Sequence, residues 1–120
     1  MSITSIYPSA ARTATPTAVT LATRRYKALY VVIDVTAIAA SPSVVPTIDG
    51  FDTESNQWFN LLTGAAITGT LTARCLRIGP GLTAAANLTV LDFLPDTVRV
   101  VMTHGDADSI TYSVSAHLLD

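Results

Sequence analysis

The sequence predicts an all-β protein: an antiparallel β-sandwich of jelly-roll or immunoglobulin-like type, or a small barrel, with an extended N-terminal arm. Thr and Val, which favour strands, are abundant, whereas the surface helix formers Glu, Lys and Gln are scarce. Several stretches alternate apolar and polar residues with period two, which is typical of half-buried strands. Turn-forming residues separate these stretches at short intervals, so we expect about eight strands.

The most regular alternation lies in residues 97–119, which contain two runs around a polar break. The side chains that share the apolar face of each run are Val98, Val100 and Met102, then Ile110, Tyr112, Val114, Ala116 and Leu118. The break at residues 105–108, Gly-Asp-Ala-Asp, consists of turn formers. We therefore expect an antiparallel hairpin here, with Asp106 and Asp108 as turn residues.

The other strands are predicted from similar runs between turns. A weak edge strand is expected at 17–23, and stronger strands at 28–38, 44–51, 57–62, 71–78 and 88–93. Asp34 lies among apolar residues of the central strand, so we expect backbone amides or an Arg to satisfy its carboxylate rather than a catalytic role.

Residues 1–27 are predicted to form an arm, and residues 28–120 the β-sandwich domain. Pro8 and Pro16 interrupt regular structure, and the residues between them are small and polar. Such a segment buries little surface of its own, so it either stays flexible or lies across a neighbouring molecule. The cations within residues 24–27 suit a solvated strand entrance, an acidic patch on a partner or, least well, nucleic acid.

Residue chemistry gives no catalytic or metal-binding signature. The chain has two histidines, His104 and His117, and one cysteine, Cys75, which the surrounding pattern places in the core. The acids of residues 49–56 do not have the spacing of an EF-hand. No nucleophile elbow or phosphate-binding loop is present. We therefore predict no enzyme activity, no cofactor and no metal.

Composition favours a protein that is buried against other molecules. The chain is 49% hydrophobic and only 13% charged, so its solvated surface is small. The net charge of -2 does not suggest a nucleic-acid partner, and no apolar run is long enough to span a membrane. The N-terminus lacks the pattern of a secretory signal, and the single cysteine fits a reducing cytosol.

Two adjacent aromatic residues, Trp58 and Phe59, point to opposite faces of their predicted strand. One is expected in the core, and the other against a second sheet or a subunit. Together with the arm they give the predicted contact residues: Pro8, Pro16, Val19, Leu21, Arg24, Arg25, Tyr26, Lys27, Trp58 and Phe59.

Four blocks of the sequence resemble a group of small virion proteins of tailed bacteriophages. They are ALYVVIDVTAI from Ala28, TIDGFDTESNQWFNLL from Thr47, LRIGPGL from Leu76 and LPDTVRVVMTHGDADSITYSVSAHLL from Leu94. The blocks follow one another in the same order as in that group and cover residues 28–119, with the closing block the most specific.

The resemblance implies a virion component, made in the host cytoplasm and placed on the capsid surface. Its expected role is a capsid decoration (cement) protein that bridges major capsid subunits, with copies of itself, as a trimer, and the major capsid protein as partners. A tail or neck protein is the alternative within the virion. A carbohydrate- or receptor-binding module is the alternative of another class, and it predicts an exposed aromatic platform flanked by polar groups.

Overall fold

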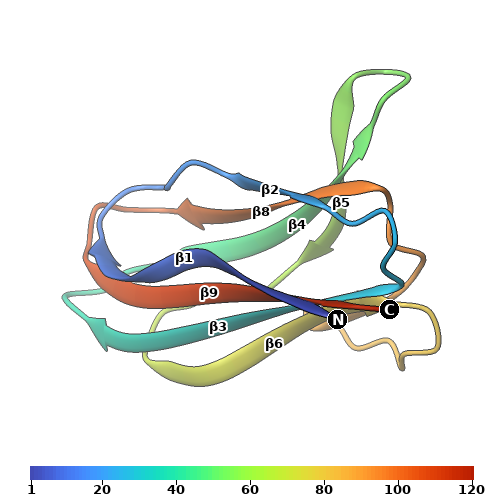
Figure 1. Cartoon of the computed structure of the whole chain (residues 1–120). Coiled ribbons are helices and arrows are strands. Elements are labelled where there is room, and N and C mark those ends of the chain that lie inside the picture. The colour runs from blue at the N-terminus through green and yellow to red at the C-terminus, as the bar shows by residue number, and fades with distance from the viewer.

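Two β-sheets face each other in the computed structural model, which describes residues 1–120 (Figure 1). The strands are β1 (Ser2–Arg12), β2 (Val19–Ala22), β3 (Ala28–Ile38), β4 (Val44–Asp52), β5 (Gln57–Thr63), β6 (Leu71–Gly79), β7 (Thr89–Leu91), β8 (Thr97–His104) and β9 (Ile110–Leu119). The predicted all-β sandwich is thereby confirmed, with nine strands and no helix. The barrel alternative is wrong, because both sheets are open.

The larger sheet has the order β1-β9-β3-β6-β7 and the smaller one β2-β8-β4-β5. All pairs are antiparallel except β6 and β7, which are parallel. The predicted hairpin of residues 97–119 is wrong, since β8 and β9 belong to different sheets. Both strands turn their apolar faces inward, so they cover the core from opposite sides, and the connection crosses the roughly 10 Å between sheets.

The first 27 residues do not form a separate arm. β1 pairs with β9 from Ser2↔Leu118 to Arg12↔Ile110, and β2 pairs with β8. The expected edge strand at 17–23 is confirmed as β2. The backbone ladders, together with three buried side chains, hold this segment in place: Ile6, Tyr7 and Leu21.

Proline is tolerated at position 8 because β1 is the edge strand of its sheet. Pro8 has no N–H to donate, but on the free side of an edge strand no neighbouring strand needs that hydrogen bond. The β1–β9 register shifts twice near Pro8: once before it, between Ser5 and Tyr7, and once across it, between Tyr7 and Ala10. The sequence pattern of β1 is therefore irregular, which concealed the strand.

Alternating side chains of both sheets fill the core, as the period-two pattern predicts. The core contains 21 buried residues, and Tyr112 is the largest that is fully buried. Asp34 faces outward and accepts the backbone N–H of Ala73 at 3.2 Å, as expected for a carboxylate satisfied by a backbone amide. Cys75 was predicted in the core, but it pairs with the outward-facing Val32 and is only partly buried.

Candidate interaction surface at the hairpin end

A hairpin formed by β4 and β5 projects beyond one end of the sandwich (Figure 1). Its tip is a turn in which the Asp52 carboxylate accepts the N–H groups of Glu54 and Ser55 and the Ser55 hydroxyl. Asn56, in the left-handed region at φ 58°, completes the turn. The hydrogen bonds, above all that from the Ser55 hydroxyl, lower the pKa of Asp52.

The outer face of the hairpin carries a row of polar and aromatic side chains. Arg99 Nε donates to Asp49 Oδ2 at 2.9 Å, and Asn60 Nδ2 donates to Asp49 Oδ1 at 3.3 Å. The Arg99 guanidinium also lies 4.5 Å from the centre of the Trp58 ring, and Phe51 packs on Trp58 with ring centres 4.8 Å apart. These contacts stiffen the base of the hairpin.

The other face of the hairpin exposes an aromatic ring. Phe59 lies opposite Gly50, and a methyl group at Gly50 would come within 2.7 Å of Phe59 Cζ and 2.9 Å of Pro95 Cγ. The glycine thus lets the ring lie close against the strand, yet Phe59 stays 44% exposed. The prediction that Trp58 or Phe59 enters the core is wrong, because the hairpin extends past the second sheet.

Most exposed large apolar side chains lie at the same end of the sandwich as this hairpin (Figure 1). We call this region the hairpin end and define it as residues 50–59, the segments 23–27 and 80–96, and the terminal residues Met1 and Asp120. Five of the seven exposed large apolar side chains belong to it: Met1, Phe59, Leu88, Leu91 and Phe93. Phe93 is 79% exposed, and the one such residue at the opposite end, Ile38, is 39% exposed.

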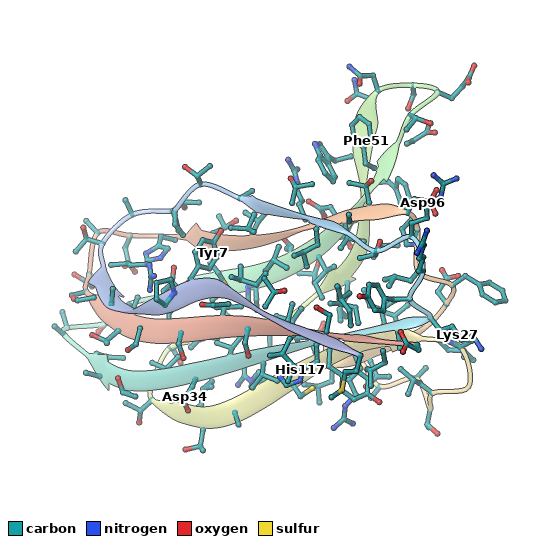
Figure 2. All side chains as sticks on the ribbon, viewed as in Figure 1. Tyr7, Lys27, Asp34, Phe51, Asp96 and His117 are labelled. Carbon is teal, nitrogen blue, oxygen red and sulfur yellow. The ribbon has the colours of Figure 1, made fainter.

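Charges of both signs surround these apolar groups. Arg24, Arg25 and Lys27 are exposed in the connection before β3. Figure 2 shows Asp96 near the base of the hairpin and Lys27 farther from it, at the same end of the sandwich. Arg24 lies 4.0 Å from Asp96 in an exposed pair. An apolar centre with a mixed-charge rim is the usual composition of a protein–protein interface.

The structure brings together six of the ten predicted contact residues. The residues at the hairpin end are Arg24, Arg25, Tyr26, Lys27, Trp58 and Phe59. Leu21 is buried, and Val19 and Tyr26 pack against the core, so these three are structural rather than contact residues. Pro8 is exposed on β1, and Pro16 lies in the connection at the opposite end.

The opposite end contains a cluster of polar aromatic groups that the sequence did not indicate. His104 Nε2 lies 2.9 Å from the Tyr112 hydroxyl, Arg12 donates to the Tyr112 carbonyl at 2.8 Å, and Tyr7 donates to the Thr17 carbonyl at 2.6 Å. The Arg12 guanidinium also lies over the Tyr112 ring at 4.6 Å. His104 thus has a structural role in this cluster.

Burial shifts the pKa values of three groups in this cluster. It raises the pKa of Tyr112 to about 12 and also raises the pKa of Tyr7. The pKa of His104 is lowered, first by burial and then by the charge of Arg12, against an opposing effect of Asp106. The His104 Nδ1 atom is buried without a hydrogen-bond partner. The side chains of Tyr7, His104 and Tyr112 are therefore uncharged at neutral pH, and together with Arg12 they connect β1, β8 and β9.

The rest of the surface offers no concave site. No pocket is found, and no three His, Cys, Asp or Glu side chains stand close enough together to hold a metal ion. The structure has no helix that could cross a membrane. Comparisons with protein-family models, with curated proteins and with solved structures gave no match.

The exposed residues of the connection 80–96 were also missed by the sequence reasoning. Leu88, Leu91 and Phe93 lie between a Gly-Pro-Gly turn and Pro95, and their run is too short for reliable periodicity. The segment has turn-forming residues at both ends and contains three large apolar residues, and this combination could have indicated an exposed apolar patch.

Proposed function

We propose that this protein is a structural component of a tailed-bacteriophage virion, placed on the capsid surface as a decoration protein. It would bridge neighbouring major capsid subunits through the hairpin end and stabilise the head. The observation that carries this proposal is the concentration of exposed large apolar side chains at the hairpin end. The resemblance of four sequence blocks to small phage virion proteins is the basis for the proposed class of assembly.

The hairpin end has the physical features that attachment to a shell requires. Covering an exposed Phe or Leu side chain contributes about 1.5–3 kcal/mol, so a few such residues give a modest affinity per copy. Many copies on a repetitive lattice add avidity, and modest contacts then suffice. The stiffened hairpin presents Phe59 in one orientation, which reduces the entropy lost on binding.

The proposed partners are the major capsid protein and other copies of this chain, arranged as a trimer. The protein would be made in the host cytoplasm and would take its place on the assembled head. A tail or neck position is the alternative within the virion, and the same surface would serve there.

Attachment to capsid shells purified without tails tests the proposal. The double variant Phe59→Ser, Phe93→Ser should bind at least about tenfold more weakly, because two apolar contacts are lost. Ile38→Ser, at the opposite end, is the matched control and should bind like the original chain. Equal binding of both variants, or no binding of the original chain to tail-free shells, would overturn the decoration role.

Deleting residues 1–25 would not be a suitable test of attachment. The deletion removes β1 and β2 together with three core side chains, so the remaining chain would lose edges of both sheets. Point substitutions of exposed residues leave the strands intact.

A carbohydrate- or receptor-binding role is the second candidate, favoured by the row of Asp49, Phe51, Trp58 and Asn60 on the hairpin. Against it, Arg99 and Phe51 both pack on the Trp58 ring, so that ring is not a free platform. A glycan array separates the two candidates: binding that Trp58→Ala abolishes would favour this role, and silence across the array would count against it.

A further inference from the structure

The free edge of β1 is the longest open strand edge in the molecule. β1 spans 11 residues and pairs only through its β9 side, whereas the edge strands β2 and β7 have 4 and 3 residues. Its free side presents unpaired backbone N–H and C=O groups, which can bind another strand. No charged side chain precedes Arg12 in β1 to oppose such pairing.

Two features restrict pairing to the first part of this edge. Pro8 has no N–H to donate, and the register shifts around Tyr7 distort the strand there. Residues Ser2 to Ser5, in contrast, keep a regular register against β9, from Ser2↔Leu118 to Ser5↔Ser115. The start of β1 is therefore the segment that can accept a further strand.

The side chain of Ile3 indicates what that further strand is. Ile3 pairs with His117, which lies between the buried residues Ala116 and Leu118, so both Ile3 and His117 face outward. Figure 2 shows His117 beside the N-terminal strand. Ile3 is 61% exposed, an unusual state for an isoleucine in a regular strand.

We propose that two copies of this chain pair antiparallel through the starts of their β1 strands, with the two Ile3 side chains opposite each other. Residues directly opposite in an antiparallel pair lie on the same sheet face. A two-fold axis through Ile3 then places Ser2 against Thr4 of the partner subunit, both on the inner side, and joins the larger sheets into one. A neighbouring register centred on Thr4 would instead engage Ile6, where the strand is irregular.

Self-pairing suits this edge better than binding a different strand. The segment has no charge that would select a partner of opposite sign, and its one large apolar side chain meets an equal one. The contact lies away from β5, which borders β7 at the other edge of the larger sheet. The pairing uses the free edge of β1, to which neither Phe59 nor Phe93 belongs, and it is compatible with a trimer only as a link between trimers.

Sedimentation of the purified chain over a range of concentrations tests the pairing. We expect a reversible monomer–dimer equilibrium. Ile3→Lys, which places two like charges opposite each other, should weaken it by about tenfold or more. Ser9→Lys, exposed on the same strand beyond Pro8, is the matched control and should leave it unchanged. Equal melting temperatures show that both variants keep the fold.

Cross-linking tests the register itself. With Cys75 replaced by Ser, Ile3→Cys should form a disulfide-linked dimer under mild oxidation, since opposite residues lie about 4.5–5.5 Å apart at Cα, within disulfide range. Ser9→Cys in the same background should not. A chain that stays monomeric at every concentration, or equal cross-linking of the two cysteine variants, overturns the proposal. Attachment to capsid shells is tested separately, through Phe59 and Phe93.

Discussion

The two ends of the sandwich differ in how far their large side chains are exposed to solvent. At the end away from the hairpin, Tyr7, Arg12, His104 and Tyr112 bind one another or the backbone, and their side chains are wholly or partly buried. At the hairpin end, Phe59 and Phe93 face solvent, and so do several other large apolar side chains. The polar cluster lies on strands that pack against each other, whereas Phe59 lies on a hairpin that projects beyond the sandwich and Phe93 lies in a connection.

This contrast separates groups that stabilise the fold from groups that are free to bind. The polar cluster fastens the N-terminal strand, because Arg12 and Tyr7 lie on β1 while His104 and Tyr112 lie on β8 and β9. The apolar residues of the hairpin end make few contacts within the chain, so their removal should cost little stability. Four measurements would break or sharpen the distinction.

The largest expected effect is that of Tyr112→Ala, which should lower the free energy of unfolding by about 3–5 kcal/mol. Tyr112 is fully buried, and the substitution leaves a cavity and removes the partner of His104. Phe93→Ala, at the exposed end, should change stability by less than about 0.5 kcal/mol. Urea unfolding monitored by circular dichroism measures both. Similar losses would mean that Phe93 is part of the folded core.

A smaller loss, of about 1–2 kcal/mol, is expected for Arg12→Met. The guanidinium donates to the carbonyls of Tyr112 at 2.8 Å and Pro8 at 2.6 Å and also covers the Tyr112 ring. Arg24→Met is the control, because Arg24 forms only an exposed pair at 4.0 Å. If the Arg12 variant unfolded like the Arg24 variant, the cluster would not fasten β1.

Trp58→Ala should loosen the hairpin with a global loss of only about 1 kcal/mol or less. The Trp58 ring contacts Phe51 within the hairpin and Arg99 on β8. Its removal should make the hairpin tip more mobile, while the core of the sandwich stays intact. Hydrogen exchange should accelerate at residues 51–58 and stay unchanged in β3. Unchanged exchange at the tip would show that the backbone ladder alone holds the hairpin.

The smallest effect concerns pH. The pKa of His104 lies below its ordinary value of 6.5 in the folded protein, so the unfolded chain takes up the proton first as pH falls. Stability should therefore decline as pH drops below about 6.5 and should stop declining, as far as His104 is concerned, once the folded form is also protonated. Melting temperatures between pH 7.5 and 5 measure this slope.

Substitution of this histidine assigns the pH effect. His104→Gln should flatten the slope over that range. A slope that persists in the His104 variant would locate the titrating group elsewhere.

Alternation predicted the strands well where one face of the strand is buried and the other is solvated. β3 and β9 follow this rule over nearly their whole length, and their expected boundaries agree closely with the structure. β1 could not be found in this way, because its register shifts around Tyr7 break the period and Pro8 is tolerated only at an edge. Which strands pair was equally hidden, as shown by the separation of β8 from β9.

The candidate site was only partly predictable for a related reason. Trp58 and Phe59 were expected on opposite strand faces, one in the core and the other at a contact, but local pattern does not show that β4 and β5 outrun the facing sheet. A strand was expected at 88–93, whereas β7 covers only Thr89–Leu91, and Leu88, Leu91 and Phe93 are exposed. Long-range packing decides both features, and alternation along the chain does not record it.

Met1 and Asp120 lie side by side, with the terminal amine 2.9 Å from the Asp120 carboxylate. An affinity tag fused at either extremity would therefore hang over the same region as Phe59 and Phe93. Such a fusion could block attachment sterically. The tag is better inserted in a connection at the opposite end, such as the residues between β8 and β9.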